Sequence, residues 1–486
     1  MPFNSMQFLF FFAIVTAMYF AIPYRFRWIL LLGASYYFYI SWKPAYVILI
    51  IITTFITYSA GLWMGKIATK SKRKTILILS LFFNLGFLFV FKYYNFFNDS
   101  LRVIFQHCNL FYGSPALNVL LPIGISFYTF KNLSYAIDVY RGDQSPEKHL
   151  GYYALYVAFF PQLLAGPIER ATRFLPQLFE KFAFDYVRVT NGLKLMLWGL
   201  FQKMVVADNL APLVDSVYKD PTHHQGIGLI LGTLFFAFQI YCDFAGYSDM
   251  AIGAAQVMGF TTMDNFNRPY FSKSIPEFWR RWHISLSTWF RDYLYIPMGG
   301  NRVTIPRWYF NLFIVLLICG LWHGANWTFL VWGGLHGIYL VFSVLTQGIR
   351  EKVRKTIGLD RVPRLHNALK IVVTFFLVCF AWIFFRANSI SDAIYILSHL
   401  FTGWGGLGIQ TPKAIPFFGP LKFQWVVGVV SVGILLLIHL LQGGNHFDQW
   451  LSKKRISLRW AVYYSMVLAI LLFGHFGAKE FIYFQF

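Results

Sequence analysis

The sequence predicts an all-α integral membrane protein with many membrane-spanning helices. Hydrophobic residues make up 57% of the 486 positions and charged residues only 13%, whereas a soluble chain carries about 25% charged residues. Aromatic residues alone reach 21%, which gives more apolar surface than one water-soluble core could bury. Because a spanning helix needs about 20 apolar residues, the chain has room for roughly ten to twelve passes.

Nine apolar runs are the clearest predicted spans: residues 7–23, 28–42, 44–63, 75–95, 309–321, 326–346, 367–386, 424–441 and 460–476. The first run lacks a preceding cation and is followed by Arg25 and Arg27, the reverse of a secretory signal, so we expect an uncleaved span. Between residues 120 and 260, Gly, Pro, Asp and Gln interrupt the apolar segments. This pattern predicts tilted, broken or re-entrant helices around a site.

The charge pattern predicts the orientation. The chain has a formal net charge of +22, and its cations form short clusters between spans, as in the cytoplasmic loops of membrane proteins. We place four clusters in the cytoplasm: Arg25 with Arg27, residues 66–74, residues 350–364 and residues 453–459. The N-terminus and residues 403–420 then lie outside. The last span brings the C-terminus to the outer face, or lets it dip back into the protein from that side.

Other classes of protein are disfavoured by the same composition. No basic domain or basic patch with exposed aromatics is present, so nucleic-acid binding is not expected. Four cysteines, at positions 108, 242, 319 and 379, fit neither a metal pair nor a dense disulfide framework, and most should be buried. No serine-hydrolase elbow, zinc helix or phosphate-binding glycine loop occurs. No internal repeat or soluble domain is visible, and residues 1–486 are expected to form a single membrane domain.

His323 is the first candidate for chemistry. It lies in CGLWHGANW directly after an apolar run, with Gly320, Gly324 and Ala325 beside it. An ionisable group at membrane depth is a functional hypothesis by default. Small neighbours permit close helix approach and leave room for a substrate. The alternative is a histidine that is only hydrogen-bonded inside a helix bundle.

His283 is the second candidate. It lies in a segment where Trp279, Trp282 and Trp289 alternate with arginines, namely Arg280, Arg281 and Arg291. This mixture is typical of a headgroup-level segment, and it could also bind a polyanionic, adenine-bearing ligand through arginine pairing and stacking. The alternative is a helix that lies on anionic lipid. His336, in GGLHG, is a weaker third candidate.

Three acidic residues also lie in apolar surroundings: Asp138, Asp243 and Asp249. Buried carboxylates can orient histidines or carry protons. More often, such a carboxylate only pairs with an arginine or a backbone amide.

The last six residues, FIYFQF, centre on Tyr483. Such a tail can be an aromatic anchor at the membrane interface. A phenol is also chemically useful there, because its pKa near 10 is close to that of a thiol, near 8.5. An acyl ester on Tyr483 would keep much of the transfer potential of a thioester and could pass its acyl group to a hydroxyl.

Four segments of the sequence resemble the membrane-bound O-acyltransferase (MBOAT) family: residues 121–142, 159–170, 239–302 and 319–337. They are similar to its alginate O-acetyltransferase branch, alongside the transferases that O-acetylate peptidoglycan or cellulose and the D-alanyl transfer protein of teichoic acids. The resemblance implies about eleven spans, with re-entrant or interfacial helices, around a central funnel. It places the invariant histidine of the family at His323 and its second histidine at His283.

The resemblance also implies the reaction and its partners. The C-terminal FxYFxF pattern of related acyl-export systems matches residues 481–486, with Tyr483 as the acyl carrier. Acetyl-CoA is the expected donor, with its phosphates near Arg280, Arg281 or Arg291 and Trp282 beside them, and no metal is expected. The expected partner is an extracytoplasmic, SGNH-type serine esterase-like protein that acetylates a secreted or cell-wall polysaccharide. The expected location is a bacterial inner membrane.

Within this scheme we expect His323 to act as general base toward Tyr483, and His283 to orient His323 or line the donor path. Two alternatives remain open. A direct O-acyltransferase would use residues 481–486 only as an anchor. A transporter is suggested by interrupted helices, although it would not release thiol from acetyl-CoA. The acceptor polymer, the acyl chain and the oligomeric state are left open.

Overall fold

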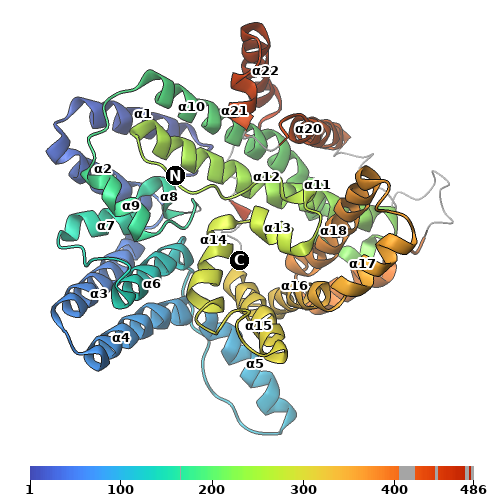
Figure 1. The fold of residues 1–486 in the computed structure, drawn as a ribbon, viewed down its shortest axis with the longest axis horizontal. Coiled ribbons are helices and arrows are strands. Elements are labelled where there is room, and N and C mark those ends of the chain that lie inside the picture. The colour runs from blue at the N-terminus through green and yellow to red at the C-terminus, as the bar shows by residue number, and fades with distance from the viewer. Residues whose placement is uncertain (165, 404–421, 444–446, 477–480, 483–486) are drawn as a thin grey trace. The chain divides into compact units, whose positions relative to one another are not determined.

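The computed structural model describes the whole chain except residues 165, 404–421, 444–446, 477–480 and 483–486. All regular elements among the described residues are helices, and no strand occurs there, which confirms the all-α prediction. The helices, labelled in Figure 1, belong to two compact units. The first comprises residues 1–193 and 251–263, and the second comprises residues 194–250 and 264–485.

The first unit is built from the N-terminal helices. In chain order these are α1 (Met6–Ala21), α2 (Tyr24–Ile40), α3 (Val47–Lys66), α4 (Lys70–Leu88), α5 (Tyr94–His107), α6 (Ile125–Arg141), α7 (Leu150–Ala158), α8 (Phe160–Leu163) and α9 (Ala171–Phe174), followed by the start of α10 (Tyr186–Leu200). Two short 3-10 helices, η1 (Pro44–Tyr46) and η3 (Leu175–Phe179), and the π-helical segment η2 (Phe89–Tyr93) connect or extend them.

A buried chain of side-chain hydrogen bonds joins four helices of this unit. Asn84 on α4 donates to Thr57 on α3 at 2.9 Å, and Asn132 on α6 donates to Asn84 at 3.2 Å. The hydroxyl of Tyr153 on α7 donates to Asn132 at 2.8 Å. In a bilayer the hydrophobic effect does not drive apolar helices together, because lipid tails are equally apolar. Interhelical hydrogen bonds of this kind therefore help to hold the helices in contact.

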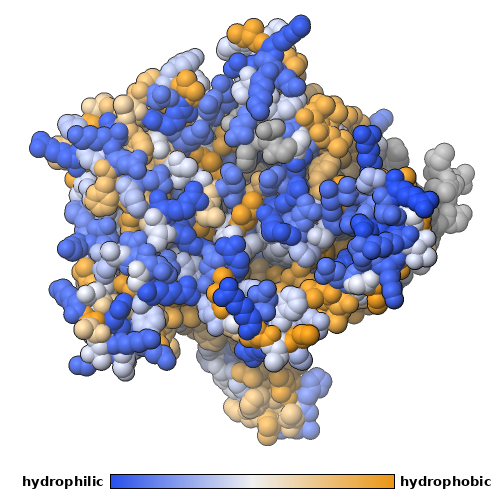
Figure 2. All heavy atoms as spheres, in the orientation of Figure 1, coloured by the Kyte–Doolittle hydropathy of each residue, from blue (hydrophilic) through white to orange (hydrophobic). Residues whose placement is uncertain are grey.

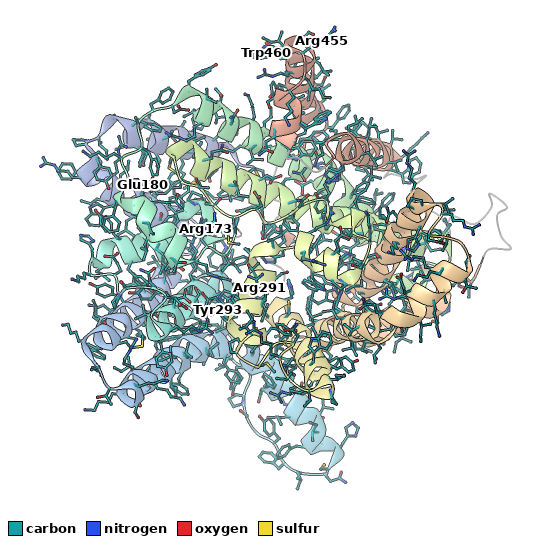
Figure 3. The ribbon with its side chains drawn as sticks, in the orientation of Figure 1. Arg173, Glu180, Arg291, Tyr293, Arg455 and Trp460 are labelled. Atoms are coloured by element: carbon teal, nitrogen blue, oxygen red, sulfur yellow. The ribbon has the colours of Figure 1, made fainter. Side chains whose placement is uncertain are left out.

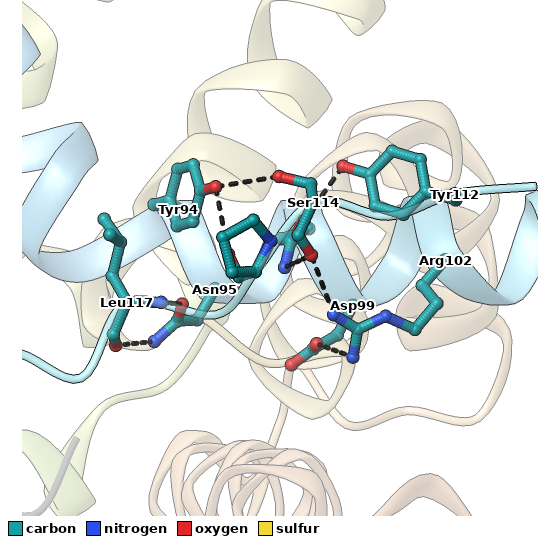
Figure 4. Close-up of polar contacts among 9 residues, drawn as sticks. Tyr94, Asn95, Asp99, Arg102, Tyr112, Ser114 and Leu117 are labelled. Atoms are coloured by element: carbon teal, nitrogen blue, oxygen red, sulfur yellow. Dashed lines mark hydrogen bonds and ion pairs between the residues drawn. The ribbon is translucent and has the colours of Figure 1, made fainter.

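Helix α5 and the connection after it are tied together by polar contacts (Figure 4). Asn95 donates to the carbonyl of Leu117 at 2.9 Å and accepts from its N–H at 2.8 Å. Arg102 donates to the carbonyl of Ser114 at 3.1 Å, and the Tyr94 and Ser114 hydroxyls lie 3.0 Å apart. These bonds satisfy backbone groups of a connection that has no secondary structure of its own.

The second unit carries the candidate residues. Its elements are η4 (Phe201–Ala207), α11 (Asp208–Tyr218), η5 (Pro221–His223), most of α12 (Ile227–Met258), η6 (Pro269–Phe271), α13 (Ile275–Arg281), α14 (Ile284–Phe290), η7 (Arg291–Tyr295), α15 (Ile305–His323), α16 (Trp327–Leu345), α17 (Gln347–Thr356), α18 (Pro363–Arg386), α19 (Ile390–His399), α20 (Lys422–Leu441), α21 (Phe447–Ser452) and α22 (Ile456–Phe473). Three segments, η2, η4 and η7, are π-helical.

The interrupted middle of the chain is only partly as predicted. Helices α7, α8, α9 and α11 are short, and the π-helical segment η4 lies between α10 and α11, in agreement with the prediction of broken helices, whereas α6 runs for 17 residues. Helix α12, however, runs unbroken for 32 residues, about 48 Å at 1.5 Å per residue. At Gly246 of this helix the absence of a side chain permits close packing, because a Cβ there would lie 2.6 Å from the carbonyl oxygen of Gly199.

Each of the nine clearest predicted spans coincides with a helix. Among the described residues, eight helices are long and apolar enough to cross a membrane. Helices α1 and α2, with 16 and 17 residues, cover the first two predicted spans but are shorter than those eight. The figure of about eleven spans therefore stays a prediction. Residues 404–420 of the predicted outer stretch lie outside the described residues.

Helix α17 is the most polar helix of the second unit and buries none of its residues. It carries the cations Arg350, Lys352, Arg354 and Lys355, and Figure 2 shows a hydrophilic area over this helix. Lysine and arginine clusters of this kind follow spanning helices on the cytoplasmic side. The cytoplasmic placement of this cluster stays a prediction.

Candidate active site

The turn between α13 and α14 positions His283. Ser274 caps the N-terminus of helix α13, because its side chain accepts from the N–H of Glu277 at 3.3 Å. Helix α13 ends at Arg281. Two residues later, His283 takes a left-handed conformation with φ of 43°, which is uncommon for a residue with a side chain. This kink separates the two helices and places the imidazole in the interior, fully buried.

Asn265 holds the His283 ring. Its side-chain oxygen lies 2.9 Å from His283 Nδ1 and also accepts from the Ser285 hydroxyl at 2.9 Å and the Ser285 N–H at 3.4 Å. A backbone N–H only donates, so the oxygen of the Asn265 amide faces this cluster. His283 Nδ1 therefore carries the proton, and Nε2 is a hydrogen-bond acceptor.

Burial also sets the charge of His283. Desolvation lowers the pKa of its imidazole from 6.5 to about 3 because a cation is disfavoured away from water. His283 is therefore neutral at pH 7. A neutral ring whose Nδ1 proton is held by Asn265 can accept a hydrogen bond or orient a second group.

His323 is the last residue of α15, and its side chain is buried. Its ring is 6.5 Å from the ring of His283, between centroids. Aromatic edges and faces surround it, with Trp322 at 4.9 Å, Trp332 at 5.0 Å and Phe385 at 5.4 Å. The structure thus brings together two histidines that are 40 residues apart in the sequence, inside an apolar shell that strengthens electrostatic interactions.

Glycines let α15 and α16 pack in direct contact. A Cβ at Gly320 would lie 2.3 Å from the carbonyl oxygen of Phe329, and one at Gly333 would lie 2.4 Å from that of Leu316. A Cβ at Gly324 would lie 2.1 Å from the Phe329 ring. The predicted close approach is confirmed. The expectation that Gly320 and Gly324 leave room for a substrate is wrong, because Phe329 fills the space beside both.

The third histidine lies in an aromatic cage. His336 on α16 is fully buried, stacked on Phe278 at 5.9 Å and flanked by Trp279 at 5.2 Å and Trp332 at 5.0 Å. Neither of its ring nitrogens has a hydrogen-bond partner among the described residues. Its ring is 5.0 Å from Trp332, which also contacts His323, so Trp332 links His336 to the pair formed by His283 and His323.

The tryptophans near His283 are interior residues. Trp279, Trp282 and Trp289 are all buried, so the alternative of a helix lying on the lipid surface does not fit this segment. Trp282 stacks on Phe278 at 5.6 Å and contacts Trp382 at 5.1 Å. Its indole therefore supports the turn that carries His283.

The three arginines differ in their surroundings. Arg281 is paired with Glu277 at 2.6 Å, one helical turn earlier. Arg280 and Arg291 are exposed, and Arg291 also contacts Asp292 at 2.7 Å. Figure 3 shows Arg291 and Tyr293 on η7, just after α14. An exposed guanidinium near the end of a buried helix can meet a phosphate with little desolvation cost.

The C-terminal tail enters the second unit. Phe481 and Ile482 are 2% and 4% exposed, and the Phe481 ring packs on Tyr247 at 4.7 Å and Phe244 at 5.6 Å. Phe244 in turn meets the His283 ring edge-on at 4.6 Å. Tyr483 lies outside the described residues. The two residues before it are interior, unlike those of an interfacial anchor.

Two functional candidates were missed by the sequence patterns. Asn265 lies in a polar connection 18 residues before His283 and gives no motif. Lys203 is buried inside an apolar run, where it pairs with Asp208 at 2.9 Å and with Asp243. A lysine in such a run is itself a signal. Asp249 accepts from Gln202 at 2.7 Å, and Asp138 lies on α6 in the first unit.

Comparison with known proteins identifies the family. Residues 147–387 match the family model described as MBOAT, membrane-bound O-acyltransferase. The chain is 41% identical over 408 residues to the probable alginate O-acetylase of Pseudomonas aeruginosa, covering 83% of this chain and 75% of that relative. The chain belongs to the membrane-bound O-acyltransferase family. It is thus an O-acyltransferase and a multi-pass membrane protein.

Other relatives modify cell-wall polymers. The chain is 35% identical over 408 residues to the peptidoglycan O-acetyltransferase of Helicobacter pylori, covering 79% of this chain and 74% of the relative. It is 30% identical over 290 residues to the teichoic acid D-alanyltransferase of Bacillus subtilis, covering 56% and 71%. The MBOAT segment contains His283, His323 and His336, and the tail lies beyond it. Among the described residues, no three His, Cys, Asp or Glu side chains gather as in a metal site.

Proposed function

We propose that this O-acyltransferase moves an acetyl group from cytoplasmic acetyl-CoA across the bacterial inner membrane for O-acetylation of an alginate-like secreted or cell-wall polysaccharide. Its alginate and peptidoglycan O-acetylating relatives support this assignment. An extracytoplasmic, SGNH-type serine esterase-like protein receives the acetyl group and selects the polymer. Both chain termini lie toward the outer side.

Acetyl-CoA binds with its phosphates near Arg280 and Arg291, the two exposed cations that flank the buried histidine segment. Arg281, already held by Glu277, contributes to the same positive field. The thioester reaches His323 in the apolar interior. Water exclusion there protects the acyl group from hydrolysis and strengthens hydrogen bonds to the developing oxyanion.

The chemical step is attack of the Tyr483 phenol on the thioester carbonyl. His323 accepts the phenolic proton, the phenolate oxygen bonds to the carbonyl carbon, and the tetrahedral intermediate collapses with loss of the coenzyme A thiolate. The thiolate takes the proton back from His323, and the acetyl group remains as an ester on Tyr483. Proton transfer of this kind contributes roughly 10²- to 10⁴-fold to the rate.

His283 has a different role in this scheme. A ring whose pKa is about 3 holds a proton too weakly to be an effective base near neutral pH. Its Nε2 instead accepts a hydrogen bond that orients the reacting groups, while Asn265 fixes the tautomer. His323 is left as the proton acceptor.

The burial of the tail beside His283 is the observation that carries this proposal. Phe481 packs on Phe244, and Phe244 packs on His283. Tyr483 is two residues beyond Phe481, and consecutive Cα atoms are about 3.8 Å apart. The tail therefore enters on the side of the protein where the two histidines meet.

The test uses cells that O-acetylate their polysaccharide through this protein. Tyr483→Phe removes only the phenolic oxygen, so polymer acetylation should be lost while membrane levels of the protein stay normal. Phe484→Tyr combined with Tyr483→Phe, which moves the phenol by one residue, should not restore it. Wild-type acetylation in Tyr483→Phe would instead support direct transfer, and acetylation without release of coenzyme A thiol would support a transporter.

A further inference from the structure

A buried ion cluster lies next to the tail. Lys203 lies in the π-helical segment η4, and its side chain is 3% exposed. Its ammonium group is 2.9 Å from Oδ1 of Asp208, five residues later, and also contacts Oδ1 of Asp243 on α12. In a π-helix, residues five apart lie above each other, so the π-helical segment allows Lys203 and Asp208 to pair.

This cluster has two carboxylates for one ammonium group. Buried charges are strongly disfavoured unless they are paired and hydrogen-bonded. The second oxygen of Asp243, Oδ2, accepts a hydrogen bond from the backbone N–H of Ile482 at 2.7 Å. A charge-assisted hydrogen bond is about twice as strong as a neutral one, and the contact between Lys203 and the other oxygen of Asp243 fixes this carboxylate in position.

The hydrogen bond from Ile482 is made by its backbone N–H and does not depend on its side chain. Recognition of a particular side chain in the tail comes from the preceding residue, Phe481. The Phe481 ring packs on both Phe244 and Tyr247, which lie one and four residues after Asp243 on the same helix. The single helix α12 therefore presents an aromatic seat for residue 481 and a charged acceptor for residue 482. Both contacts end directly before Tyr483.

We propose that Asp243 is a positioning residue that docks the C-terminal tail, with Lys203 as its support, so that Tyr483 is delivered to the His283 and His323 pair. This inference rests on the proposed role of Tyr483 as acyl carrier. It adds that the tail is held by an ion cluster outside the catalytic histidines. Residue 482 can vary in side chain but must keep its N–H.

The bond can be removed from either side. Asp243→Ala removes the acceptor and leaves Lys203 paired with Asp208. Ile482→Pro removes the donor and leaves the whole cluster intact, because proline has no N–H. The matched controls are Asp249→Ala, on the same helix, whose carboxylate accepts from Gln202, and Ile482→Val, which keeps the N–H. Monodisperse elution in detergent checks folding for all four.

The first readout is digestion of the purified protein by carboxypeptidase, followed by intact mass, which does not depend on catalysis. The wild type and both controls should resist removal of residues 481 and 482. Asp243→Ala should lose them at least about tenfold faster, as a tenfold shift needs only the loss of one such bond. Ile482→Pro is compared only in the second readout, because carboxypeptidases release proline poorly. Unchanged digestion of Asp243→Ala would overturn the docking role.

The second readout is the rate of the first thiol release from acetyl-CoA, because Tyr483 accepts one acetyl group per chain. Both variants should lower this rate at saturating acetyl-CoA, written here as kcat, about tenfold or more, and they should leave its half-saturating concentration (KM) unchanged because the donor site is intact. Faster digestion with unchanged kcat would overturn the positioning role. If the wild-type tail resists digestion but never carries an acetyl group, the docking contact stands and the proposed function fails, so the two failures are distinguishable.

Discussion

The imidazoles of His283 and His323 lie 6.5 Å apart between ring centroids, in the buried interior of one compact unit. One is held by the α13–α14 turn and the other ends α15. Their different surroundings give them different tasks: Asn265 fixes the tautomer of His283, and aromatic rings enclose His323. The predictions below follow from this division.

Replacing Asn265 tests the tautomer of His283. Asn265→Ala removes the acceptor of the Nδ1 proton, and a neutral hydrogen bond is worth about 1 kcal/mol, so kcat should fall roughly five- to tenfold. Asn265→Asp keeps an acceptor oxygen and should retain more activity than the alanine variant. The measurement is thiol release from acetyl-CoA by purified protein. Equal activity of Asn265→Ala and wild type would contradict the assignment.

Gly333 and Gly334 are adjacent on α16 but differ in the room that each has for a side chain. A Cβ at Gly333 would lie 2.4 Å from a backbone oxygen, whereas one at Gly334 would have its nearest atom at 3.8 Å. Gly333→Ala should therefore destabilise the protein by about 1–3 kcal/mol through overpacking. Gly334→Ala should be neutral or stabilising, by up to about 1 kcal/mol. Thermal midpoints in detergent check both, and equal midpoints would refute the packing of α15 on α16.

The buried His283 makes stability depend on pH. Its pKa is about 3 in the folded protein against an ordinary 6.5, so between these values the unfolded chain binds more protons than the folded one. Stability should be fully present above pH 6.5 and should fall as the pH drops, by at most about 2 kcal/mol at pH 5. His283→Gln should flatten this part of the profile of thermal midpoint against pH. The control is His107→Gln, at an exposed histidine, which should leave the profile unchanged. A slope unchanged in His283→Gln would exclude the burial of His283 as the cause of the pH dependence.

The exposed arginines should act on donor binding. Arg280→Gln and Arg291→Gln should each raise the KM for acetyl-CoA about three- to tenfold, because each removes about 1 kcal/mol of screened attraction to phosphate. The maximal rate should change little. Arg455→Gln, directly before the first residue of α22 (Figure 3), removes an equal charge elsewhere and serves as control. A loss of kcat with unchanged KM would place the arginines in the chemical step instead.

The helices could be predicted from the sequence, because long apolar runs leave few alternatives in a bilayer. The 40-residue spacing of His283 and His323 could not show that they meet, and the resemblance to a family supplied that pairing. The continuity of α12 was missed because Gly and Asp usually weaken a helix. In α12 tight backbone packing at Gly246 and the pairing of Asp243 with Lys203 outweigh those preferences.

The contacts of the site were less predictable. Asn265 reaches His283 through the folded turn, and the bond from Ile482 to Asp243 spans 239 residues. No local pattern encodes such contacts, since they depend on tertiary packing. The tail motif predicted that residues 481–486 matter, and its two described residues, Phe481 and Ile482, are buried, with Phe481 packed on Phe244, which contacts His283.

The most direct test of the acyl-tyrosine account is intact-protein mass spectrometry after incubation of the purified protein with acetyl-CoA. The account predicts one added acetyl group on the C-terminal peptide of the wild type and none in Tyr483→Phe or His323→Ala, both of which should still bind coenzyme A. A wild-type protein that binds and turns over acetyl-CoA without any acetyl adduct on this peptide would contradict it.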